Sequence, residues 1–223
     1  MKLRKLLLEE ISTAEAARLL RNYYTKPGLK GRVRTGARFD TWAGGGDAPD
    51  VVNTITADDM LAASFLSVPF EPTAVIGLLD ERRVDISALL SRIPFDLDLA
   101  DLKDGDFEAV LGVGSPAWKL WDVLRGNDLE EKEKWGIGPT RASKLMARKR
   151  PRLIPIWDSV VQTQTESKGS LNQWTDWHEA LTEDGCALAH HLDDVQELAK
   201  LPHRISRLRA MDVVLWMRGR PAA

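Results

Sequence analysis

Several features that identify common protein classes are scarce or absent in this chain. There is a single cysteine, Cys186, which excludes an internal disulfide, a cysteine-ligated iron–sulfur cluster and a zinc site of several cysteines. No run of about 18 apolar residues occurs, so we expect no membrane-spanning helix. Glu9 and Glu10 stand where a signal peptide needs small residues, so we expect no signal peptide. These absences favour a cytoplasmic protein that carries no cofactor.

A strong net charge is lacking as well. The 31 lysines and arginines nearly balance the 33 aspartates and glutamates, and the net charge is −2. The chain as a whole is therefore no electrostatic binder of nucleic acid, and any such binding must come from a local basic patch. With 43% hydrophobic residues, no internal repeat and no low-complexity tail, the chain is expected to form one compact unit over residues 1–223.

Alternating strand patterns are also scarce, and the best of them, residues 95–99, is short. Helix signals recur instead. Ser12 with Glu15, and Thr56 with Asp59, have the spacing of capping boxes, and prolines and glycines mark other helix ends. The predicted fold class is therefore mainly α, with a compact multi-helix domain. The expected helices are 12–24, 56–66, 72–79, 86–91 (capped by Asp85), 116–125 (capped by Ser115), 140–149, 159–166, 171–182, 192–200 and 204–217, and the expected loops are 25–36, 44–53 and 94–107.

The last of these loops is acidic, but its pattern does not predict a metal site. Its aspartates miss the spacing of a calcium-binding loop, because Ala100 and Asp101 occupy the places of the third ligand and the glycine. We interpret it as a solvated acidic loop. His178, His190 and His191 have no companion carboxylate at a ligand spacing, so no metal site is predicted elsewhere.

One segment combines glycines with a helix start. Gly136 and Gly138 flank Ile137, which allows a tight turn and leaves amide N–H groups uncovered at the start of the next helix. Such amides, together with the helix dipole, form a phosphate site. Ile137 would close the turn from beneath, and the small Ala142 would let two helices approach. The pattern predicts two short helices within residues 129–149, joined at these glycines.

Basic residues follow directly on the predicted phosphate site. Arg141, Lys144 and Arg148 share one face of the helix, and no acidic residue occurs from Gly136 to Trp157. A basic stripe is usually a solvated helix face. Because this one adjoins the anion-binding turn through Thr140, we interpret it as an extension of the contact with a nucleic-acid backbone.

The residues after this predicted helix provide a second signal, which is the spacing between Gly138 and an aspartate. Residues 153–156 are apolar and lead into Trp157 and Asp158, and Asp158 lies 20 positions after Gly138. Asp158 is expected to start a helix. Over residues 136–161 the chain resembles the helix-hairpin-helix/Gly-Pro-Asp base-excision DNA glycosylases, in which the corresponding aspartate is catalytic.

This resemblance implies a helix-hairpin-helix with an aspartate-started helix over residues 129–161, and duplex DNA as the partner. Asp158 would stabilise the sugar cation as the base leaves, and Trp157 would line the pocket that receives the base. Thr140 stands where bifunctional members carry a Schiff-base lysine, so a monofunctional enzyme is implied. A second resemblance, to an actinobacterial family of unknown function, rests on residues 56–60, 147–155 and 211–217.

Two other interpretations stay open at this stage. Asp158 is fully explained as a helix N-cap whose side chain accepts from the amide of Val160 or Val161, in which case the protein would bind DNA without catalysis. Alternatively, the basic stripe would meet an acidic protein partner. The sequence itself names no protein partner.

Overall fold

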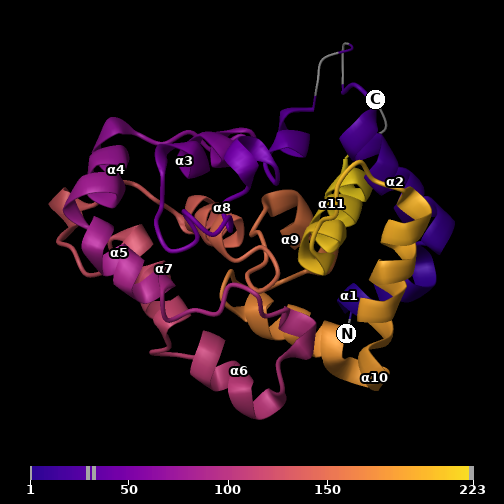
Figure 1. Ribbon diagram of the computed structural model, residues 1–223. Helices are drawn as coiled ribbons and strands as arrows, with labels where there is room; N and C mark the ends of the chain where they lie inside the picture. Colours follow the sequence, from indigo (N-terminus) through magenta and orange to yellow (C-terminus); the bar gives the residue numbers. More distant parts are fainter. Residues whose placement is uncertain (1, 29–30, 32–33, 221–223) are drawn as a thin grey trace. The chain divides into compact units, whose positions relative to one another are not determined.

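The structure is a computed structural model that describes residues 2–28, 31 and 34–220. Within these residues the chain is built from helices and contains no strand, which confirms the mainly α class (Figure 1). The short alternating pattern at residues 95–99 forms no strand. Residues 95 and 96 form a bend and Leu99 begins a 3-10 turn, because a short extended run without a partner strand has no ladder of hydrogen bonds to join. None of the described helices is both long enough and apolar enough to cross a bilayer.

The chain divides into two compact units where the sequence predicted one. The terminal unit comprises the residues up to 37, residues 98–101 and those from 155 onward, and the central unit comprises residues 38–97 and 102–154. Both units are discontinuous in sequence. No glycine- or proline-rich linker marks the crossing at Ile154–Pro155, so composition alone does not reveal this boundary.

Helices from both ends of the chain form the terminal unit. α2 packs against α10 and α11, and α9 packs against α11 (Figure 1). The approach of α9 to α11 requires a glycine, because a Cβ at Gly219 would lie 2.7 Å from a methyl group of Val160. The helices are α1 (Lys2–Lys5, continued by a π-helical turn at Leu6–Glu10), α2 (Thr13–Thr25), α9 (Ser159–Thr165), α10 (Asn172–Ala199) and α11 (Arg207–Gly219).

The two helices predicted at 171–182 and 192–200 are present as parts of α10. The residues Glu183–Cys186 between them are not helical, and Asp184, Gly185 and Cys186 have positive φ angles. The second helix begins earlier than predicted. In the loop predicted at 25–36, residues 29–30 and 32–33 lie outside the described part of the chain.

The central unit contains the segment, residues 129–149, that was predicted to form the hairpin. α8 packs against α3 and α7, and α5 packs against α7 (Figure 1). The helices are α3 (Ala57–Ser64), α4 (Pro72–Ile76, continued by a π-helical turn at Gly77–Glu81), α5 (Arg83–Leu90), α6 (Asp104–Leu111), α7 (Pro116–Arg125) and α8 (Pro139–Lys149).

Side-chain caps account for the starts of two of these helices, α3 and α7. Thr56 and Asp59 form the predicted capping box of α3, and Ser115 accepts from the amide of Trp118 at the start of α7. The predicted cap at Asp85 is wrong. α5 begins at Arg83, three residues before the predicted start at Ile86, and the carboxylate of Asp85 accepts instead from the guanidinium of Arg82, 3.0 Å away.

Candidate nucleic-acid interface

The glycine turn before α8 is present and open on its outer side. Gly136 has a φ of 70°, in the left-handed region that favours glycine, and Gly138 is the extended N-cap residue of α8. A Cβ built on either glycine meets no atom within 4 Å. Ile137 between them is buried, as predicted. The first turn of α8 contains no acidic residue, so the positive end of its dipole is not neutralised from within.

The first helix of the predicted hairpin is reduced to a single 3-10 turn, Glu131–Glu133. α7 has already ended at Gly126 in the left-handed conformation, and the segment before the glycine turn is held by a side chain instead. The indole Nε1 of Trp135 donates to the carbonyl oxygen of Leu124 at 2.8 Å, and its ring lies against Gly77, where a Cβ would be 2.4 Å away. The turn therefore has one regular helix, on its carboxyl side.

Arg141 braces this turn from within the central unit. Its Nε donates to the carbonyl oxygen of Pro69 at 2.7 Å, and one terminal nitrogen donates to the carbonyl oxygen of Gly136 at 3.0 Å. Its side chain is half-buried, like that of Thr140. Arg141 thus fixes the conformation of Gly136, a positioning role that the sequence did not predict.

The remainder of the predicted basic stripe is buried. Lys144 is 2% exposed, and its Nζ donates to the carbonyl oxygen of Leu66 at 2.9 Å. Arg148 is 3% exposed, and its guanidinium donates to the carbonyl oxygens of Phe39, Asp40 and Trp42. Both cations are surrounded by protein acceptors, so in this structure they do not extend a phosphate contact. These residues face the protein interior because Arg148 meets the segment before α3 and Lys144 meets the segment after it, which sequence periodicity does not reveal.

A buried charge cluster extends from Arg148 through the end of α8. The carboxylate of Asp59 lies 3.3 Å from Nε of Arg148 and 3.0 Å from Nζ of Lys149. Burial lowers the pKa of Lys149, and the nearby carboxylate opposes this shift. Burial also lowers the pKa of Arg150 to about 10, against an opposing effect of Asp47. We call Asp59, Arg148, Lys149 and Arg150 the charge cluster.

Asp59 has two roles in the structure, of which its sequence context predicts only the first. Its capping role was predicted and is confirmed by a hydrogen bond from the amide of Thr56, 2.9 Å away. Its second role, as the carboxylate partner of two buried cations, joins residues 89 and 90 positions apart. The signal that could have found it is the acid-free run after Gly136, since buried cations need an acid from elsewhere.

Asp158 belongs to the terminal unit and starts α9. Its carboxylate accepts from the amide of Val160 at 3.0 Å, as an N-cap does. Asp158 and its neighbour Trp157 are both partly exposed. Gly136 and Gly138 lie in the central unit, so the predicted site draws its two halves from two different units. Among the described residues no group of three histidine, cysteine or acidic side chains is arranged to hold a metal ion.

Together these features define a mainly helical protein with an open glycine turn at the start of α8 and a buried arginine–lysine cluster at the end of the same helix. The chain belongs to a family of unknown function, DUF6308, whose match covers residues 16–219 and so spans parts of both units. No curated protein and no solved structure matches it significantly. The family description names no activity, and the resemblance to DNA glycosylases therefore stays a prediction.

Proposed function

We propose that the protein binds the phosphate backbone of duplex DNA through the glycine turn, residues 136–140, at the start of α8. The observation that carries this proposal is the open space beside Gly136 and Gly138 at the amino end of an 11-residue helix. Backbone N–H groups at such a helix end attract anions without any side chain. The burial of Ile137 and the brace from Arg141 hold the turn in one conformation.

The nearby acidic residues Glu130, Glu131 and Glu133 oppose tight binding of a phosphate. One of them, Glu131, forms an ion pair with Lys134 at 2.7 Å. Since Lys144 and Arg148 are buried, the contact is small. We expect one or two phosphates to be held and a log–log salt slope of about 1 to 2. We further propose a cytoplasmic location for this activity, with no cofactor.

Replacing Gly138 by Asp tests the proposal without disturbing the fold. The backbone at Gly138 is extended, with φ of −84° and ψ of 178°, and a side chain there has space. Aspartate is among the best N-cap residues, so α8 should keep its stability. Its carboxylate would occupy the amides of Thr140 and Arg141 and repel phosphate. Gly105→Asp is the matched control, because it makes the same charge change at another open glycine of the central unit.

The measurement is fluorescence anisotropy of a labelled duplex between about 50 and 200 mM salt. Wild type and Gly105→Asp should bind with the same affinity and slope. Gly138→Asp should bind at least ten-fold more weakly, with a slope lower by about 0.9 for each phosphate lost. Equal binding by both variants would contradict the proposal, and so would wild-type binding that does not depend on salt.

A second candidate function is removal of a base by N-glycosidic cleavage. The observation that favours it is the partial exposure of Asp158 and Trp157, adjacent to one another at the start of α9. In this mechanism the Asp158 carboxylate would stabilise the oxocarbenium-like sugar and orient water, and Trp157 would contact the flipped base. One oxygen of this carboxylate accepts from the amide of Val160, and a carboxylate has several acceptor sites.

Incubation with duplexes that contain deaminated, oxidised or alkylated bases tests this candidate. Since Thr140 offers no amine, the product should be an intact strand that breaks only after alkali, and borohydride should trap no adduct. Asp158→Asn keeps the cap and should lose base release, whereas Asp194→Asn, an exposed acid of the same unit, should retain it. If wild type releases no base from any duplex, the catalytic candidate fails and the binding proposal is unaffected.

A further inference from the structure

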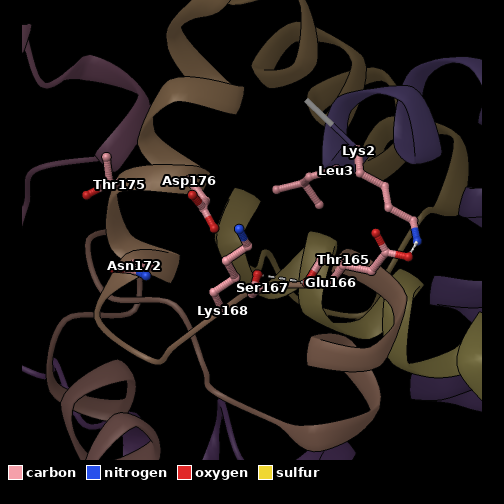
Figure 2. Close-up of a pocket in the computed structure, with 9 residues that line it drawn as sticks. All are labelled: Lys2, Leu3, Thr165, Glu166, Ser167, Lys168, Asn172, Thr175 and Asp176. Carbon is pink, nitrogen blue, oxygen red and sulfur yellow. Dashed lines mark hydrogen bonds and ion pairs between the residues drawn. The ribbon is translucent and has the colours of Figure 1, made fainter.

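A cavity of about 500 Å³ lies in the terminal unit and is lined by none of the residues of the glycine turn or of the charge cluster. Its walls come from the start of α1, the chain between α9 and α10, and the first turn of α10 (Figure 2). Its size is within the range of small-molecule sites. Most of the lining residues are polar, and the buried Leu3 is the apolar one. The polar lining residues are Lys2, Thr165, Glu166, Ser167, Lys168, Asn172, Thr175 and Asp176.

Some of these groups already have partners. Lys2 and Glu166 form an ion pair at 2.5 Å at the rim, so they neutralise each other. The hydroxyl groups of Thr165 and Ser167 lie 2.9 Å apart. The charge that remains in the cavity therefore comes from two side chains, one of each sign.

Those two side chains are Lys168 and Asp176. Figure 2 shows the ammonium of Lys168 and the carboxyl group of Asp176 directed into the same space from two segments of the wall. No salt bridge is formed by either residue within the described part of the chain. Burial raises the pKa of Asp176, opposed by a hydrogen bond with Ser167. Asp176 is thus a partly desolvated carboxyl group that would gain from a cationic neighbour.

We propose that this cavity binds a small zwitterion of the α-amino acid type, with its ammonium on Asp176, its carboxylate on Lys168 and an aliphatic side chain towards Leu3. This site is independent of the DNA-binding turn, which belongs to the other unit.

The charge arrangement distinguishes this ligand class from simpler ones. An anion without a positive group would be attracted by Lys168 and repelled by Asp176. A cation without a negative group would be attracted by Asp176 and repelled by Lys168. A neutral sugar would leave both charges without a charged partner while displacing their water. A zwitterion satisfies both groups, and each charge-assisted contact contributes about ten-fold or more to affinity.

Calorimetric titration of the full chain with L-leucine tests the proposal. Two analogues isolate the charges: isoamylamine lacks the carboxylate and 4-methylvalerate lacks the ammonium. Asp176→Asn and Lys168→Gln remove one protein charge each while keeping size and hydrogen-bonding capacity. Lys119→Gln, an exposed lysine on α7 in the other unit, is the matched control. Both site residues are accessible, so thermal unfolding should verify that every variant folds.

L-leucine should bind wild type and Lys119→Gln equally, and each site variant should bind it about ten-fold or more weakly. Both analogues should bind wild type more weakly than L-leucine by a similar factor. The proposal is overturned if no standard L-amino acid gives saturable heat. It is also overturned if the site variants bind like wild type, or if either analogue or glucose binds as tightly as L-leucine.

Discussion

Neutralising Asp59 is the most informative perturbation of the central unit. Its carboxylate serves two buried cations and the amide of Thr56 at once, and the side chain is almost wholly inaccessible. Asp59→Asn preserves the shape and removes the charge. The ammonium of Lys149, 0% exposed, then loses its carboxylate partner. Removing one partner of a buried ion pair typically costs about 3–5 kcal/mol, out of about 5–15 kcal/mol for a whole domain.

Equilibrium urea unfolding at pH 7 measures this loss. Asp58→Asn is the control one residue away. Asp58 is exposed, and asparagine keeps the side-chain oxygen that accepts from the indole N–H of Trp42. It should change the free energy of unfolding by no more than about 0.5 kcal/mol. In the double variant Asp59→Asn/Lys149→Met the unpaired ammonium is gone, so part of the lost stability should return.

The loss in free energy of unfolding caused by Asp59→Asn should also depend on pH. Burial lowers the pKa of Lys149 below its value in the unfolded chain, and loss of the carboxylate that opposes this shift lowers it further. The native variant then releases this proton at lower pH than the unfolded chain does. Its stability relative to wild type should therefore rise as pH increases towards about 10. A deficit equal to that of Asp58→Asn, or one that grows with pH, would refute this account of the charge cluster.

Two further predictions concern close approach and capping. Gly46→Ala should destabilise the central unit by about 1–3 kcal/mol in thermal or urea unfolding, because a Cβ there would lie 2.3 Å from the carbonyl oxygen of Arg148. Gly105→Ala should cause no such loss, because a Cβ at Gly105 meets no atom within 4 Å. Asp158→Ala should lose about 1 kcal/mol of stability through the missing cap on Val160, whereas Asp158→Asn should lose little; equal losses would contradict the capping role.

The features that the sequence predicted correctly depend on neighbours in the chain. The capping box of Thr56 and Asp59 and the start of α7 at Ser115 involve hydrogen bonds between residues three positions apart. The glycine turn was likewise predicted from Gly136 and its immediate neighbours, although its brace from Arg141 to the carbonyl oxygen of Pro69 was not. Asp85 shows the limit of such signals: a good capping residue can pair with a side chain three residues earlier while the helix begins without it.

The basic stripe could not be interpreted correctly from its periodicity. The spacing of Arg141, Lys144 and Arg148 establishes that they share a face, and not whether that face meets water. Apart from the carbonyl oxygen of Gly136, their acceptors include the carboxylate of Asp59 and backbone carbonyl oxygens 72 to 109 positions away. Because buried arginine and lysine are rare, a run of these residues predicts a solvent-exposed surface when its hydrogen-bond partners are not known. The division into two units was hidden for the same reason, since it depends on contacts distant in sequence.

The most direct test of the proposed DNA binding is a titration of the ¹⁵N-labelled protein with duplex DNA, followed by amide chemical shifts. The largest changes should fall on the amides of Gly136, Gly138 and Thr140, because these N–H groups would meet the phosphate. They should be lost in Gly138→Asp and kept in Gly105→Asp. Changes confined to other segments, or no changes with duplex in excess, would contradict binding through this turn.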